Sequence, residues 1–180
     1  MDELIEKAAK VLSVKIQKRR TTQDIEDIYG TAEFPKDYCL NDAKMSALCC
    51  ACALTEQNMD EQKSNEAILQ TILKYQPNLE FADQFQRRPL HFAATSGNTT
   101  AIKYLVETGK VDINAQTKGG ETALMKAGQA GYLEICKYLL DRGCDGKIKN
   151  CVGMTAVDLA CVNQRNEALL TMLNEALHKQ

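Results

Sequence analysis

The sequence predicts an all-α solenoid of about four helix-turn-helix repeats with short hairpin loops, preceded by an N-terminal helical extension. The segment Arg-Pro-Leu-His-Phe-Ala-Ala-Thr-Ser-Gly at residues 88–97 has related segments at 122–127 and 155–160. The first residues of these segments are 34 and 33 residues apart, and a fixed period of this length is typical of repeat architectures. A single helix pair cannot bury its own apolar face, so the sequence predicts that neighbouring pairs stack into one continuous core.

Composition restricts the classes of partner. The 180 residues are 44% hydrophobic and 6% aromatic, without tryptophan, which predicts a core of Leu, Ile, Ala and Val. A formal net charge of -2 provides no general attraction to phosphate backbones or anionic lipid. The apolar runs are shorter than the roughly 18 residues of a membrane helix. We therefore expect no nucleic-acid partner and no membrane contact.

The eight cysteines are expected to be reduced thiols. The chain shows no charged-then-apolar leader, and Cys49, Cys50 and Cys52 are crowded together, which favours a cytoplasmic chain over an oxidised scaffold. Successive side chains on a helix point about 100° apart, and no second Cys-x-x-Cys pair completes a metal site. We expect these three thiols to be buried as small apolar residues. Cys144 and Cys151 flank a predicted hairpin, but a cytoplasmic setting argues against a bridge between them.

The N-terminal part is predicted to be helical. Residues 2–19 form an amphipathic pattern whose apolar stripe consists of Ile5, Ala9, Leu12 and Ile16. This stripe either packs against the first repeat as a cap or docks on a partner. A second short helix is expected to begin at Thr21 or Thr22 and to run to about Tyr29, before a stop at Gly30. A connecting loop is expected over residues 31–41.

The first repeat is degenerate and contains an insertion. Its inner helix is expected to follow Ser46, but the distance to the next repeat is 42 residues, about nine too many. The excess lies in a polar stretch around residues 55–65. Either the turn between the two helices carries an inserted loop, or both helices are about one turn longer. The insertion is a candidate specificity element, although tolerated surface loops are more common.

The sequence of the later repeats predicts clearer helix boundaries than that of the first repeat. The second repeat predicts an inner helix over 89–96 closed by Gly97, and an outer helix around 101–106 that Gly109 ends. The third predicts an outer helix over 133–140, and the fourth a final helix over 167–178. The expected inward stripes of these two helices comprise Leu133, Cys136, Leu139 and Leu140 in the third repeat and Leu169, Leu170, Leu173 and Leu177 in the fourth. The polar outer face of the last helix suits a terminal cap.

The motif at residues 88–97 resembles the start of an ankyrin repeat, whose signature is Thr-Pro-Leu-His, a variable residue, two alanines and a closing glycine. The resemblance extends over residues 42–180 and is strongest over 83–160. It implies an extension over residues 1–41, followed by repeats over about 42–82, 83–116, 117–149 and 150–180. For His91 it implies a structural role, in which the imidazole bonds backbone groups of neighbouring repeats.

Two residues depart from the family pattern. Gln86 stands where the family has the hairpin glycine, so either a left-handed backbone there costs about 1–2 kcal/mol or the first hairpin differs in shape. Arg88 replaces the hydroxyl residue that begins the inner helix, which removes a side-chain oxygen able to bond the backbone. We therefore expect an irregular corner at residues 86–88.

The resemblance also implies a concave protein-binding surface formed by the hairpin tips and the inner helices. Matched position by position, this surface comprises Gln84, Phe85, Arg87, Thr95, Ser96, Lys118, Glu121, Gln129, Cys151, Val152, Met154, Val162 and Asn163. Phe85, Val152 and Met154 are apolar at predicted exposed tips, which favours a hydrophobic contact line along one edge. The 55–65 insertion and the helix over 2–19 are further candidate contact regions.

The sequence shows no phosphate-binding glycine loop, dinucleotide fingerprint, paired histidines at metal spacing or nucleophile elbow. We expect no catalytic residues, cofactor, metal or small-molecule substrate. The predicted function is non-enzymatic protein binding. The chain is either a scaffold or structural subunit of a larger assembly, for example a cytoskeletal or ciliary one, or a soluble adaptor or inhibitor of an enzyme. A thiol or zinc enzyme would require converging Cys and His ligands.

Overall fold

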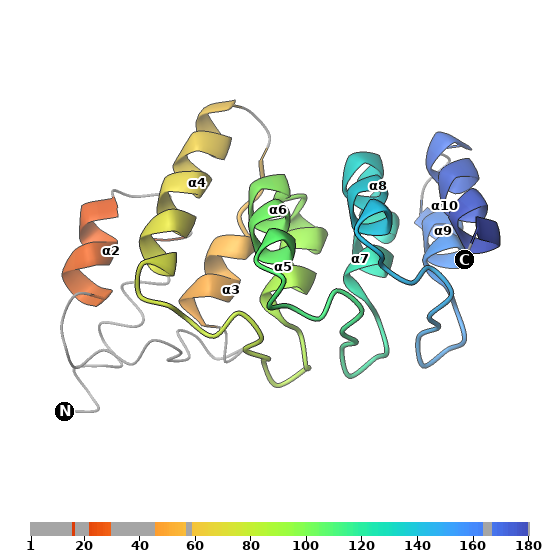
Figure 1. Cartoon of the computed structure of the whole chain (residues 1–180), viewed down its shortest axis with the longest axis horizontal. Helices are drawn as coiled ribbons and strands as arrows, with labels where there is room; N and C mark the ends of the chain where they lie inside the picture. The colour runs from red at the N-terminus through yellow and green to blue at the C-terminus, as the bar shows by residue number, and fades with distance from the viewer. Residues whose placement is uncertain (1–15, 17–21, 30–45, 57–58, 164–166, 180) are drawn as a thin grey trace.

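The fold is a row of helix pairs stacked side by side, as Figure 1 shows for this computed structural model. The structure describes residues 16, 22–29, 46–56, 59–163 and 167–179. These residues contain helices and loops but no strand, which confirms the predicted all-α solenoid. The helices are α2 (Thr22–Tyr29), α3 (Ala47–Cys52), α4 (Met59–Leu73), α5 (Pro89–Ser96), α6 (Thr99–Glu107), α7 (Ala123–Ala130), α8 (Leu133–Asp141), α9 (Ala156–Asn163) and α10 (Glu167–Lys179).

Helices α3, α5, α7 and α9 form an inner row, in which each packs on the next. Each inner helix also packs on the outer helix that follows it in the chain, and α4 contacts α6 as α8 contacts α10. The inner row is built from two recurring positions. A large aliphatic residue is buried at Leu48, Leu90, Leu124 and Val157, and an alanine is buried at Ala51, Ala93, Ala127 and Ala160. The alanines let the inner helices approach closely, while the larger residues fill the space between layers.

The inward stripes of the outer helices agree only partly with prediction. In α8, Cys136 and Leu139 are buried, but Leu133 and Leu140 are half-buried and Ile135 occupies the core in their place. In α10, Leu169 and Leu173 are buried and Leu170 is half-buried. Helical spacing identifies the correct side of the helix, but the edges of the stripe depend on how the neighbouring helix crosses it.

The first repeat resolves the two alternatives for its insertion. Helix α3 is short, with six residues, whereas α4 has 15 residues against nine in α6 and in α8. The outer helix alone is extended, so the alternative in which both helices lengthen is wrong. The segment between α3 and α4 contacts the second repeat, because Glu56 Oε2 accepts a hydrogen bond of 3.0 Å from the Thr99 backbone N–H. A carboxylate is favourable at this position, the N-terminus of α6.

At the N-terminal end, α2 spans Thr22–Tyr29, as predicted. It packs on α4, with Ile25 fully buried and a salt bridge of 2.7 Å between Lys74 Nζ and Glu26 Oε1. Ile16 is helical and fully buried. The rest of the helix expected over 2–19, Gly30 and the loop expected over 31–41 lie outside the described residues.

Gln86 adopts a left-handed backbone, the first of the two alternatives for its position, with φ at 59°. The equivalent residues of the next two hairpins are Gly120 and Gly153, with φ at 75° and 83°. The corner also departs from the family at Arg88, whose side chain does not cap α5. Instead, its guanidinium pairs with Glu80, and the Nδ1 atom of His91 accepts the Arg88 backbone N–H at 3.1 Å.

We expect Gln86→Gly to stabilise the chain by up to about 1 kcal/mol. Glycine relieves the left-handed strain of about 1–2 kcal/mol, but it costs about 0.5–1 kcal/mol through the greater freedom of the unfolded chain. The Gln86 side chain is exposed, so little packing is lost. Urea denaturation measures the change. The control is Gln84→Gly in the same hairpin, where the backbone is not left-handed; an equal gain there would contradict the explanation.

Candidate functional site

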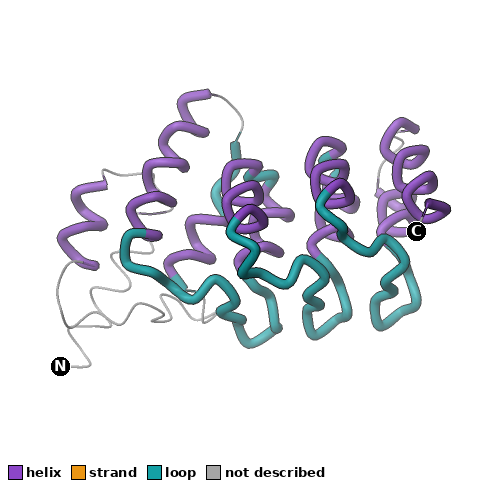
Figure 2. The backbone as a smooth tube through the Cα atoms, in the orientation of Figure 1, coloured by secondary structure: helices purple, strands orange, loops and turns teal. Residues whose placement is uncertain are grey.

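Three hairpin tips project from one edge of the stack, as the loops in Figure 2 show. Each tip is closed by one polar residue, namely Asp83, Thr117 or Asn150. Its N–H donates to the carbonyl four residues later, and its carbonyl accepts from the N–H three residues later. Its side-chain oxygen also accepts a backbone N–H from the same tip. Because these bonds satisfy the backbone locally, the tips hold a defined shape.

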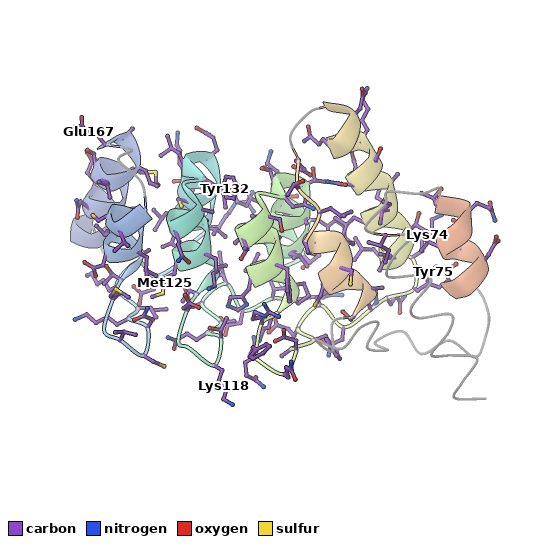
Figure 3. The ribbon with its side chains drawn as sticks, turned by 180° about the vertical axis from the view of Figure 1, so that it is seen from behind. Lys74, Tyr75, Lys118, Met125, Tyr132 and Glu167 are labelled. Carbon is purple, nitrogen blue, oxygen red and sulfur yellow. The ribbon has the colours of Figure 1, made fainter. Side chains whose placement is uncertain are left out.

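Neighbouring tips are also bonded to one another. The Lys118 N–H donates to the Phe85 carbonyl at 2.9 Å, and the Cys151 N–H donates to the Gly119 carbonyl at 3.0 Å. Figure 3 shows Lys118 at the end of the middle tip. A Cβ atom on Gly120 would lie only 2.8 Å from the Cys151 backbone nitrogen. The tips therefore form one rigid row.

His91 joins the second repeat to the hairpin of the third. Its Nε2 atom lies 3.0 Å from the Ala115 carbonyl oxygen and 3.1 Å from that of Glu121. Because Nδ1 accepts from Arg88 and Nε2 faces two carbonyls, the neutral tautomer with its proton on Nε2 satisfies every contact. Burial lowers the pKa of His91, although the two carbonyl acceptors act in the opposite direction. This arrangement confirms the structural role expected for His91.

The lowered pKa of His91 predicts a loss of stability on acidification. In the unfolded chain His91 becomes protonated below about pH 6.5. In the folded chain the same protonation occurs only at a lower pH. The free energy of unfolding should therefore fall below pH 6.5 by up to about 1.4 kcal/mol per pH unit from this residue. Urea denaturation between pH 7.5 and 5 checks it. The neutral variant His91→Gln, less stable at pH 7, should show a shallower slope; an unchanged slope would contradict the assignment.

Arg87 contacts two aromatic rings at the first tip. Its guanidinium carbon lies 5.1 Å from the centre of the Phe85 ring and 4.8 Å from that of Phe92. On its edge, Nε donates to Asp83 Oδ2 at 2.8 Å, and Nη2 lies 2.7 Å from the same oxygen. Cation–π contact and ion pairing fix this side chain in one orientation.

A cavity of about 230 Å³ opens beside this stack. Its walls come from the first three repeats: Ala53 follows α3, His91, Phe92, Thr95 and Ser96 belong to α5, and Lys126 belongs to α7. Arg87 completes the lining. The cavity therefore lies on the side of the stack formed by the tips and the inner helices, which we call the tip face.

The structure places the predicted partner-binding residues on the tips and the inner helices, but with unequal exposure. The exposed ones are Gln84, Phe85, Thr95, Lys118, Cys151, Val152 and Val162. The half-buried ones are Arg87, Ser96, Glu121, Gln129 and Met154. Asn163 ends α9, and its side chain lies outside the described residues.

The expected line of three apolar tip residues is wrong in one member. Phe85 is 49% exposed and Val152 is 78% exposed, but Met154 is half-buried and packs against the core. Met154 lies at the base of its hairpin, where its N–H donates to Asn150 Oδ1 and the chain turns into α9. The middle tip has Gly119 at the position of Phe85 and Val152. The apolar tips are therefore two patches separated by a small residue, with Val162, 73% exposed, further along α9.

The thiols of the first repeat are buried, as predicted. Cys49, Cys50 and Cys52 lie in α3 with almost no exposed surface. Burial raises the pKa of the Cys49 thiol to about 11 and raises that of Cys52 well above its ordinary value. Protonated thiols are poor metal ligands and poor nucleophiles. Among the described residues, no three His, Cys, Asp or Glu side chains are grouped so that they could hold a metal ion.

Sequence inspection missed two features of the molecule. Asp83, Thr117 and Asn150 stand six residues before the first residue of α5, α7 and α9, a spacing that marks the closing residue of each tip. Tyr104, 40% exposed, lies on the outer helix α6 beside a hollow of about 480 Å³ that also reaches Leu73 and Pro77. It belongs to the opposite side of the stack from the tips.

No helix in the described part of the chain is long and apolar enough to cross a membrane. Comparison with known families matches residues 59–150 and 111–180 to ankyrin repeats. The match covers more than half of the chain, in agreement with the helix pairs, the tips and the His91 bonds described above.

Similar curated proteins match about half of this chain or less. Protein phosphatase 1 regulatory subunit 12A of Mus musculus is 38% identical over 91 residues, 51% of this chain and 8% of the relative. Alpha-latroinsectotoxin-Lt1a of Latrodectus tredecimguttatus is 35% identical over 72 residues, 40% of this chain and 5% of the relative. NAD-capped RNA hydrolase NUDT12 of Macaca fascicularis is 33% identical over 88 residues, 49% of this chain and 18% of the relative.

The chain spans less than a fifth of the length of each of these relatives. The names of these relatives, a phosphatase regulatory subunit, a toxin and an RNA hydrolase, indicate no single activity. Ankyrin repeats are protein-interaction modules, which present an extended surface built from successive repeats. The chain belongs to the ankyrin-repeat family.

Proposed function

We propose that this chain is a non-enzymatic scaffold or structural subunit that binds another protein along its tip face. The observation that carries the proposal is the rigid row of tips with Phe85 and Val152 exposed at its ends. Exposed apolar surface on a rigid backbone marks protein-interaction sites, and the aromatic Phe85 is the stronger candidate for a central contact. A surface that is already ordered also loses little conformational entropy on binding, which favours affinity.

The second candidate function is a soluble adaptor or inhibitor that regulates an enzyme. It is supported by the similarity to a protein named as a regulatory subunit of a phosphatase. The two candidates differ in the lifetime and composition of the complex. Affinity purification from the source cell, followed by size fractionation, separates them. A large particle that survives high salt favours a structural subunit, whereas a free chain or a complex with one enzyme favours the regulator.

Apolar contacts at the tips predict that Phe85→Asp and Val152→Asp each weaken binding of the captured partner by about tenfold or more. Burying an unpaired carboxylate at an interface costs well above the 1.4 kcal/mol that corresponds to tenfold. Both side chains are exposed, so the variants should fold. The matched control is Tyr104→Asp, an exposed aromatic residue on the outer side of the stack. Titration calorimetry measures the three affinities; a loss with Tyr104→Asp alone would place the interface elsewhere.

A further inference from the structure

The cavity beside the first tip has the size and charge of a receptor for one side chain. Its volume of about 230 Å³ lies below the roughly 300–1,000 Å³ of sites for drug-sized ligands. Arg87 and Lys126 are its charged lining residues, and none of the residues that line it is acidic. Its apolar floor includes Ala53 and Phe92.

The buried carboxylate of Asp83 fixes the orientation of Arg87 and leaves part of its guanidinium available to a ligand. The Asp83 side chain has no exposed surface. Its Oδ1 atom accepts the N–H groups of Phe85 and Arg87 at 2.9 and 2.8 Å, and its Oδ2 atom faces Arg87 Nε and Nη2. These bonds leave Nη1 of the guanidinium unused, while the side chain as a whole remains 35% exposed. A guanidinium that is fixed in orientation and has unused N–H groups can donate hydrogen bonds to the carboxylate of a ligand.

The other polar groups of the cavity are committed to the repeat itself. The Thr95 hydroxyl donates to the His91 carbonyl, and the Ser96 hydroxyl donates to the Phe92 carbonyl, both at 2.9 Å. Lys126 Nζ donates to Glu121 at 2.5 Å, which occupies one of its three donors. The remaining hydrogen-bond donors of the cavity therefore belong to two cations, Arg87 from the first tip and Lys126 from α7.

We propose that this cavity receives the carboxylate of an acidic residue in a peptide segment of the partner, with an adjacent apolar residue packed on the exposed ring of Phe85. The inference rests on the proposed function, because it names the chemistry of the segment that the tip face binds. Lys118, exposed on the neighbouring tip, adds a further positive charge to the tip face. Charge complementarity thus selects an acidic segment over a neutral one.

The test uses random 12-residue peptides displayed on phage and selected against the full chain. Enriched peptides should carry Asp or Glu next to an apolar residue. Resynthesised with Asn or Gln at the acidic position, they should bind about tenfold more weakly or worse, because a charge-assisted hydrogen bond is lost. Peptides that keep their affinity after this change would overturn the proposal.

Variants of the chain test whether the cations of the cavity cause the preference for acidic peptides. Lys126→Met and Arg87→Leu should each reduce the affinity for the acidic peptides about tenfold. Arg87 also holds the tip, so Lys126→Met decides the outcome if Arg87→Leu fails to fold. The matched control is Arg142→Leu, since Arg142 also stacks on an aromatic ring, 4.7 Å from Tyr138, and pairs with Glu107 away from the tips. Full affinity in the Lys126→Met variant would overturn the proposal.

A charge exchange provides a result that loss of folding cannot imitate. Lys126→Glu should weaken binding of the acidic peptide and strengthen binding of the same peptide with Lys at the acidic position. If peptides bind and lose affinity with Phe85→Asp but show no acidic preference, the carboxylate site is wrong while the proposed function stands. If no peptide is enriched, or if binding ignores Phe85→Asp and Val152→Asp, both are wrong.

Discussion

Replacing Gly120 with alanine is expected to lower the free energy of unfolding by about 3 kcal/mol. Two effects add. Gly120 has φ at 75°, and a side chain in this left-handed region costs about 1–2 kcal/mol, of which the lower freedom of the unfolded chain offsets about 0.5–1 kcal/mol. The new Cβ would also lie 2.8 Å from the Cys151 nitrogen and 3.0 Å from Asn150 Cα. These are backbone atoms of the next tip, so relief requires the two tips to separate, at about 1–3 kcal/mol.

Gly153 provides the matched control for this substitution. It occupies the same position in the next tip with φ at 83°, but a Cβ there would meet nothing within 4 Å. Gly153→Ala should therefore cost about 1 kcal/mol, since the lower freedom of the unfolded chain offsets about 0.5–1 kcal/mol of the backbone strain. Urea denaturation of both variants measures the difference between them. Equal losses would show that contact between tips contributes little to stability.

The middle tip also connects stability to binding. The hydrogen bonds from Lys118 to Phe85 and from Cys151 to Gly119 hold the three tips in one row. If Gly120→Ala separates the second and third tips, Phe85 and Val152 no longer keep a fixed distance from each other. The proposed interface would then lose its preorganisation, although each side chain remains present. Glycine at position 120 thus allows the second and third tips to pack closely in the free chain. In the proposed complex, the same close packing keeps Phe85 and Val152 at a fixed distance.

The sequence predicts the inner helices well because their signals are local. Pro89 at the first helical position and Gly97 after the last residue define α5, which spans Pro89–Ser96 as expected. The left-handed Gln86 follows from its alignment with the glycines of the other tips. His91 was also assigned correctly, because the family pattern specifies its partners. These features depend on the residue type at one position of a repeated unit.

Features that depend on contacts between repeats could not be predicted in the same way. The half-burial of Met154 results from the turn that Asn150 imposes, and sequence alignment places Met154 only near the tip. The extension of α4 without that of α3 depends on how the inserted segment meets α6 through Glu56 and Thr99. The cavity between Arg87 and Lys126 joins residues of three repeats and has no sequence signature.

Leu124→Ala is expected to destabilise the chain by about 2–5 kcal/mol, the usual range for a fully buried leucine. Leu124 has no exposed surface, and its helix α7 packs on α5 and on α9. In a stack whose stability is the sum of repeats and their interfaces, a cavity at this position weakens the contacts of the third repeat with both neighbours. The loss should therefore lie in the upper part of the range, and hydrogen exchange should accelerate in α5 and α9 as well as in α7.

Leu140→Ala gives the same chemical change in the same repeat at a half-buried position of α8. Its cost should be about 1 kcal/mol, because the side chain leaves a partly open space that water can fill. Urea denaturation yields both free energies, and the slope of the transition tests cooperativity. A reduced slope for Leu124→Ala would mean that the stack divides at the third repeat before it unfolds. An equal loss in the two variants would contradict the central position of Leu124, because burial between two neighbours is what distinguishes it from Leu140.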